Sequence, residues 1–95
     1  MKIEKVTVIG AGLMGSGIAA QVANAGLPVN LLDIVPDGAV NRNIISQSAI
    51  SKMLKPVKLG SPSQLMHSDN ADLITAGNLE DDLDLIRDSD LIIEV

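Results

Sequence analysis

The chain has 95 residues, a length that suits one domain or a part of one. Its apolar fraction of 46% can build a core, but Phe, Tyr and Trp are absent, so aliphatic side chains, methionine and alanine must form that core. Cysteine is absent as well, which excludes disulfides and thiolate metal sites.

The net charge of −5 is unevenly distributed along the chain. Residues 1–68 carry six basic and three acidic side chains, whereas residues 69–95 carry one basic and nine acidic side chains. Nucleic-acid binding requires a basic face, so the acidic segment argues against a nucleic-acid partner and suits a solvated helix face. The apolar run near the N-terminus is too short for a signal peptide or a membrane span, so we expect a cytoplasmic protein without a membrane partner.

Residues 5–33 predict a strand, a helix and a second strand. Residues 5–9 are β-branched and apolar on both faces, which is typical of a buried strand in a parallel sheet. The helix spans residues 16–25 and residues 28–33 form the second strand. The apolar stripe of the helix consists of Ile18, Val22 and Ala25. Its small residues, which allow close packing, are Gly17, Ala19, Ala20 and Ala23.

The rest of the chain continues this alternation. The predicted elements are a helix N-capped by Asp37, a strand, an acidic helix and a strand, which span residues 37–55, 73–76, 79–87 and 91–95. The order βαβαβαβ favours right-handed crossovers and a parallel sheet with helices on both faces. We therefore expect an α/β fold, a Rossmann-type doubly wound sheet of about four strands in the order 3-2-1-4. An uncovered last strand predicts that this sheet is incomplete.

Three glycines form a G-x-G-x-x-G sequence between the first predicted strand and the first predicted helix. In that context the sequence is the fingerprint of dinucleotide binding. Gly10 permits the tight turn, Gly12 lets a pyrophosphate approach the backbone, and Gly15 lets the helix lie close to the sheet. The N–H groups and the positive dipole end of the helix then face the phosphates. The alternative is a structural turn that holds no ligand.

Asp33 ends the second predicted strand, 18 residues after Gly15. An acid at this place can accept hydrogen bonds from an adenosine ribose, and it would repel the 2′-phosphate of NADP. No arginine follows Asp33 directly, so NAD is favoured over NADP. FAD is compatible with the same residues, and the alternative role for Asp33 is to cap a turn.

The segment VIGAGLMGSGIAAQVANAG resembles the start of the NAD-binding domain of the L-3-hydroxyacyl-CoA dehydrogenases. The segments LLDIVPDGAVNRN and ITAGNLEDDLDLIRDSDLIIEV resemble bacterial members of the same family, so the likeness covers almost the whole chain. This resemblance implies the oxidation of a 3-hydroxyacyl-CoA to the 3-ketoacyl-CoA with NAD, which is a step of fatty-acid β-oxidation.

The resemblance also implies roles for individual residues. Val95 matches a backbone position along the cofactor where the family more often has alanine, and Lys55 is interpreted as a contact to the CoA phosphates. The other positions that match cofactor contacts of the family are Gly10, Gly12, Leu13, Met14 and Asp33.

The catalytic His–Glu pair of the family lies beyond the segment that this chain matches. The resemblance therefore implies that residues 1–95 are the N-terminal part of an NAD-binding domain, without its remainder or the C-terminal helical domain. We expect no catalytic residue, no metal site and no turnover in this chain, an acyl-CoA substrate for the full-length enzyme, and homo-oligomers. The alternative function is a non-catalytic NAD-sensing module.

Overall fold

The computed structural model describes residues 3–54, 65 and 68–95 of the chain. Its centre is a parallel sheet of four strands in the order β3-β2-β1-β4. Val6 pairs in register with both Val29 and Leu91, so the carboxyl ends of these parallel strands lie side by side. This side of the sheet is called its carboxyl edge below. The strands are β1 (Val6–Ile9), β2 (Val29–Asp33), β3 (Ile74–Asn78) and β4 (Leu91–Glu94). The predicted α/β fold and its strand order are confirmed.

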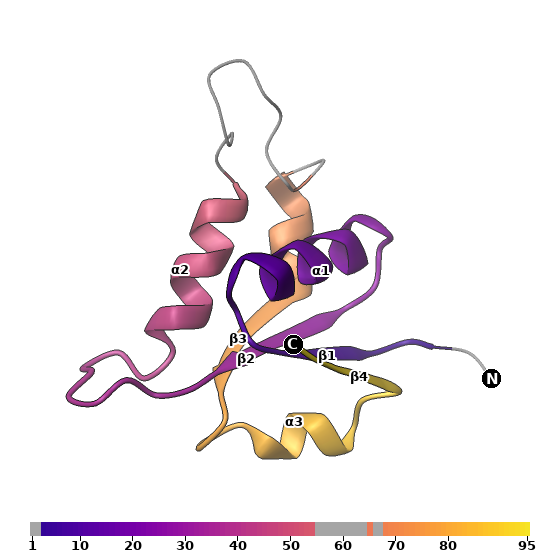
Figure 1. Ribbon diagram of the computed structural model, residues 1–95. Helices are drawn as coiled ribbons and strands as arrows, with labels where there is room; N and C mark the ends of the chain where they lie inside the picture. Colours follow the sequence, from indigo (N-terminus) through magenta and orange to yellow (C-terminus); the bar gives the residue numbers. More distant parts are fainter. Residues whose placement is uncertain (1–2, 55–64, 66–67) are drawn as a thin grey trace.

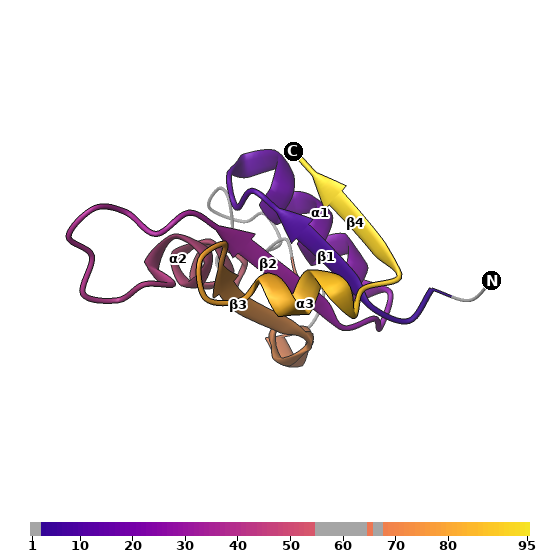
Figure 2. The ribbon, with the colours of Figure 1, turned by 90° about the horizontal axis from the view of Figure 1, so that it is seen from below.

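Helices cover both faces of this sheet. Helices α1 (Leu13–Asn24) and α2 (Ile44–Met53) lie on one face, and α3 (Leu83–Arg87) crosses the other (Figures 1 and 2). A 3₁₀ helix, η1 (Ser68–Leu73), leads into β3 and was not predicted from the sequence.

The main core lies between the sheet and the α1–α2 layer. Its strand residues are bulky and fully buried, among them Val6, Val8, Val29 and Leu31. Helix α1 packs on them with its small face, where the buried residues are Gly15, Ser16, Ala19, Ala20 and Ala23. Of the predicted apolar stripe, Ile18 and Val22 are partly buried and pack against this core, whereas Ala25 is exposed. Small side chains let the helix axis approach the bulky strand residues more closely.

Two helices begin later than the sequence pattern predicts. Helix α2 begins at Ile44, because residues 37–43 form turns in which Gly38 has a φ of +74° and Asn41 Oδ1 accepts the Asn43 N–H. Helix α3 begins at Leu83, because the preceding residues form a turn in which Asn78 Oδ1 accepts the N–H groups of Glu80 and Asp81. In both places a polar side chain competes with the helical hydrogen-bond pattern.

Strand β4 forms one edge of the sheet, and β1 is its neighbour there. Leu91, Ile92 and Val95 are 40%, 46% and 55% exposed. An exposed apolar strand edge of this kind can pair with another chain. The predicted open edge is thus present among the residues that the structure describes.

Asp90 fastens the start of β4 to the start of β1. Its Oδ2 accepts the backbone N–H groups of Glu4 at 2.8 Å and Lys5 at 3.1 Å. These two hydrogen bonds lower the pKa of the Asp90 carboxyl below its ordinary value of 3.8, and the bond from the Glu4 N–H has the larger effect.

We expect acid to weaken the fold partly through Asp90. Because its folded-state pKa lies below the unfolded one, its contribution to stability is complete above the ordinary value of 3.8 and is lost as the pH falls through the lowered pKa. The Asp90→Asn variant should therefore lose less stability on acidification than the unmodified chain. Urea midpoints measured from neutral pH downward test this, and parallel pH profiles for the two proteins would contradict it.

Candidate cofactor site

The loop between β1 and α1 turns sharply at the carboxyl edge of the sheet. Gly10 has a φ of +108°, a backbone conformation that strains residues with a side chain. Its N–H donates to the Leu32 carbonyl oxygen at 2.8 Å, which fixes the loop to the end of β2. Gly12 is the N-cap of α1, so the first turn of that helix opens at this edge.

Gly15 is required by the way α1 packs on the loop. A Cβ atom at this position would lie 1.7 Å from the Gly10 carbonyl oxygen and 3.6 Å from Val8 Cγ1. The nearest obstacle is a backbone atom, which a change of side-chain rotamer cannot move. Gly15 therefore serves the fold by letting the first turn of α1 lie directly on the loop.

Gly12 differs from the other two glycines because the protein's own packing does not require it. A Cβ atom here would meet no atom within 4 Å. Its φ of −71° and ψ of −167° are open to any residue and are typical of an N-cap, where serine or aspartate would be favoured. The glycine leaves open space in front of the first backbone N–H groups of α1, which have no partner within the helix.

The Asp33 carboxylate lies beside this loop. Its Oδ2 accepts the Ala11 N–H at 2.7 Å, and its Oδ1 accepts the Ile34 N–H at 2.6 Å. The carboxylate thus caps the loop, which is the structural role that the sequence left open. Each carboxylate oxygen has two acceptor positions, so Asp33 keeps the capacity to accept hydroxyl groups from a ligand.

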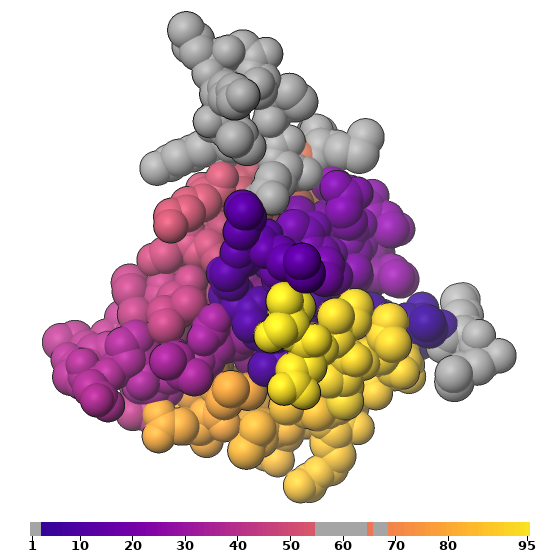
Figure 3. Space-filling model, viewed as in Figure 1, coloured from indigo at the N-terminus to yellow at the C-terminus, as the bar shows by residue number. Residues whose placement is uncertain are grey.

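Large apolar side chains surround the loop and are exposed. Val95 joins it from β4, since its N–H donates to the Ile9 carbonyl oxygen at 3.1 Å, and Figure 3 shows this end of the chain against the N-terminal segment. The exposed apolar residues at this edge are Leu13 at 90%, Met14 at 68%, Ile34 at 59% and Val95 at 55%. The structure thus gathers the predicted cofactor residues at one edge, whereas Lys55 lies outside the described residues.

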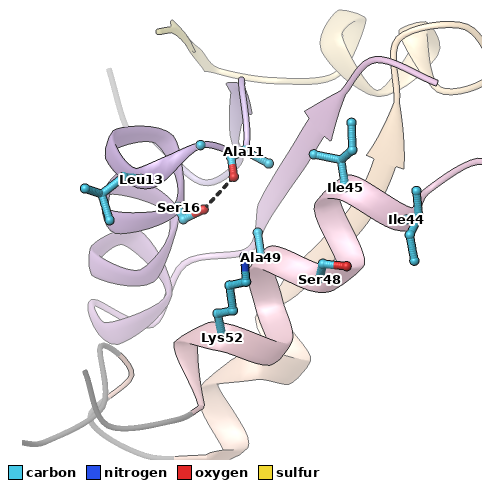
Figure 4. A pocket seen from close by; sticks show the side chains of 9 residues that line it. Ala11, Leu13, Ser16, Ile44, Ile45, Ser48, Ala49 and Lys52 are labelled. Carbon is cyan, nitrogen blue, oxygen red and sulfur yellow. Dashed lines mark hydrogen bonds between the residues drawn. The ribbon is translucent and has the colours of Figure 1, made fainter. Parts of the chain in front are cut away.

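A cavity of about 430 Å³ separates the start of α1 from α2 (Figure 4). Ser16 stands on its α1 side and donates its hydroxyl to the Ala11 carbonyl oxygen at 2.9 Å. The wall formed by α2 consists of Ile44, Ile45, Ser48, Ala49 and Lys52. Sequence reasoning did not find this wall, because its residues carry no motif and their spacing indicates only a helix.

A set of side-chain contacts, here called the polar seam, joins the start of α2 to the end of β3. Its hydrogen bonds run from Ser46 Oγ to the Gly77 carbonyl oxygen at 2.9 Å, from Asn78 Nδ2 to Asn43 Oδ1 at 2.6 Å, and from Arg42 Nε to Asp81 Oδ2 at 2.7 Å. Asn78 is only 1% exposed, so its hydrogen bonds are shielded from water. The polar seam fixes the α2 wall relative to the sheet.

The polar seam also reaches the Asp33 backbone and includes an ion pair. The Leu79 N–H donates to the Asp33 carbonyl oxygen at 2.9 Å, next to Asn78. Arg42 and Asp81 are exposed, and their hydrogen bond with each other raises the pKa of the guanidinium and lowers the pKa of the carboxyl. Sequence reasoning missed the polar seam, because its partners are more than 30 positions apart.

Within residues 3–54, 65 and 68–95, no three side chains of His, Cys, Asp or Glu come together as a metal site. In the same part of the chain, no helix has the length and apolar character needed to span a bilayer.

Residues 5–95 match the sequence model described as 3-hydroxyacyl-CoA dehydrogenase, NAD binding domain. The chain belongs to this family of NAD-binding domains. The domain is 49% identical over 94 residues to a probable 3-hydroxyacyl-CoA dehydrogenase of Deinococcus radiodurans, a match that covers 99% of the domain and 26% of the relative. A probable 3-hydroxyacyl-CoA dehydrogenase of Bacillus subtilis is 43% identical over 107 residues, with 98% and 13% covered.

A solved structure of a dehydrogenase also matches the domain. The (S)-3-hydroxybutyryl-CoA dehydrogenase of Ralstonia eutropha superposes with a TM-score of 0.63 at 30% identity, over 99% of the domain and 31% of that chain. The resemblance predicted from the sequence is confirmed, and NAD is the cofactor of the matched domain family. The domain spans about a quarter of the Deinococcus relative and less of the Bacillus one.

Proposed function

We propose that the domain binds NAD with the pyrophosphate over Gly12 and the adenosine ribose at Asp33. The observation that carries this proposal is the open space at Gly12, a position where neither packing nor backbone geometry requires a glycine. A phosphate in that space would meet the N–H groups and the positive dipole end of α1. The apolar side chains of Leu13, Met14 and Val95 would contact the rest of the cofactor.

The 95-residue chain would serve as the N-terminal part of the NAD-binding domain of a longer 3-hydroxyacyl-CoA dehydrogenase. When bound, NAD supplies the acceptor for the hydride that leaves the 3-hydroxyl carbon. The names of the relatives support a 3-hydroxyacyl-CoA as the substrate. Its oxidation at the 3-hydroxyl carbon would give the 3-ketoacyl-CoA, as a step of fatty-acid β-oxidation. The same names disfavour a non-catalytic NAD-sensing module.

The proposal extends to the CoA contact, the compartment and the self-association of the protein. Lys55 would contact the CoA phosphates, the protein would act in the cytoplasm, and the exposed apolar edge of β4 supports self-association. The 95-residue chain itself would show no turnover, because the residues proposed here bind the cofactor and do not transfer the substrate proton. Reduction of acetoacetyl-CoA by this chain with NADH would contradict that expectation.

Removal of the Asp33 carboxylate tests the ribose contact. We expect Asp33→Ala to weaken NADH binding about tenfold, because hydrogen bonds to a charged group are lost. The chain has no Trp or Tyr, so NADH fluorescence can be titrated without interference from protein emission.

The matched control for this titration is Asp33→Asn. Its side chain can still accept the Ala11 N–H, so the loop should keep its cap while the charge is lost. We expect this variant to bind NADH more weakly than the unmodified chain at nearly unchanged stability. Equal NADH affinity in all three proteins would remove Asp33 from the ribose role.

A further inference from the structure

Arg42 is the one basic residue in the segment 34–43 that follows Asp33. Both oxygens of Asp81 accept from its guanidinium, with Nε to Oδ2 at 2.7 Å and Nη2 to Oδ1 at 3.1 Å. Glu80 Oε2 lies 3.6 Å from the same Nη2. The fork of the guanidinium is therefore occupied by one carboxylate and neighboured by a second, although half of the Arg42 side chain is exposed.

This ion pair lies one strand away from the proposed ribose site. Asp81 Oδ2 also accepts Asn78 Nδ2 at 3.1 Å, and Asn78 is the residue that pairs in register with Asp33. Neighbouring strands are about 4.8 Å apart, so the end of β3 brings the pair close to the end of β2. Arg42 is long and flexible, and its own segment starts at Asp33.

NADP differs from NAD by a phosphate on the 2′-oxygen of the adenosine ribose. Dinucleotide sites that accept this phosphate place an arginine near it, because a guanidinium fork binds phosphate oxygens in a bidentate manner. In this domain the two oxygens of Asp81 occupy the N–H groups that a phosphate would need.

We propose that Asp81 holds Arg42 away from the ribose and so strengthens the selectivity of the domain for NAD over NADP. This inference rests on the proposed NAD site at Gly12 and Asp33. It adds a second determinant of selectivity to the repulsion between the Asp33 carboxylate and a 2′-phosphate.

The Asp81→Asn variant tests the proposal directly. We expect NADPH affinity to rise about three- to tenfold, because an exposed ion pair of modest strength no longer competes for the guanidinium. NADH has no 2′-phosphate, so its affinity should stay within about twofold. Both affinities are measured by fluorescence titration of the 95-residue chain, and circular dichroism checks that the variant is folded. If the asparagine variant does not fold, Asp81→Ser takes its place.

Two controls separate selectivity from a general change in structure. The double variant Arg42→Ala/Asp81→Asn should return NADPH affinity to the value of the unmodified chain, since no guanidinium remains to be released. Glu80→Gln makes the same acid-to-amide change beside the pair and should alter NADPH affinity less than about twofold, because the Asp81 hydrogen bonds persist. The gain in Asp81→Asn should also shrink at high salt.

Three results would overturn the proposal. These are an unchanged NADPH affinity in the folded Asp81 variant, a gain that persists without Arg42, and an equal rise in NADH affinity. If the unmodified chain binds no NADH, the proposed function fails and this inference fails with it. NADH binding without the NADPH gain would overturn this inference alone.

Discussion

Gly15→Ala is expected to destabilise the domain by more than about 3 kcal/mol, a large share of the stability of a small domain. The added Cβ would lie 1.7 Å from the Gly10 carbonyl oxygen, so α1 would have to move off the loop. Alanine is about 1 kcal/mol better than glycine in a helix, but this gain is smaller than the cost of the clash. Urea denaturation followed by circular dichroism measures the change in the free energy of unfolding.

Gly12→Ala is the matched control for this prediction. It adds the same methyl group three residues earlier, where no atom lies within 4 Å. We expect its free energy of unfolding to stay within about 1 kcal/mol of the unmodified value, the small loss reflecting the poor N-cap preference of alanine. Similar urea midpoints for the Gly12 and Gly15 variants would contradict the account of Gly15.

Gly12→Ser is expected to abolish most cofactor binding without loss of stability. Serine is a favoured N-cap, and the extended backbone at this position suits it, so stability should be equal or higher by a few tenths of a kcal/mol. The same side chain would occupy the space proposed for the pyrophosphate, and we expect NADH affinity to fall at least about tenfold, since displaced phosphate contacts are charge-assisted hydrogen bonds.

The two measurements on Gly12→Ser distinguish a binding role from a structural one. NADH titration and urea denaturation are done on the same preparation. A variant that unfolds more easily and binds NADH as before would reverse both expectations, and Gly12 would then be a structural glycine.

The strands and their order follow from local sequence patterns. The β-branched run at Val6–Ile9 is typical of a buried parallel strand, and alternation with helices leaves few topologies. The buried face of α1 includes Ala19, Ala20 and Ala23, the small residues that the sequence assigned to close packing, whereas the apolar stripe of Ile18 and Val22 is only partly buried. Packing geometry decides between the two, and sequence periodicity does not contain it.

The candidate site likewise has features that could be predicted from the sequence and features that could not. The glycine loop and Asp33 could be predicted, because their positions are separated by fixed spacings within one βαβ unit. The polar seam could not, since the Asn43–Asn78 contact joins residues 35 positions apart. The contact between Asp33 Oδ2 and the Ala11 N–H likewise depends on how tightly the loop is folded.

The central claim is that NAD binds across the N-terminus of α1, and a crystal structure of the complex with NAD tests it most directly. In that complex, pyrophosphate oxygens are expected within hydrogen-bond distance of backbone N–H groups beside Gly12, and ribose hydroxyl groups are expected to donate to the Asp33 carboxylate. A dinucleotide bound elsewhere, or one whose ribose makes no contact with Asp33, would contradict it.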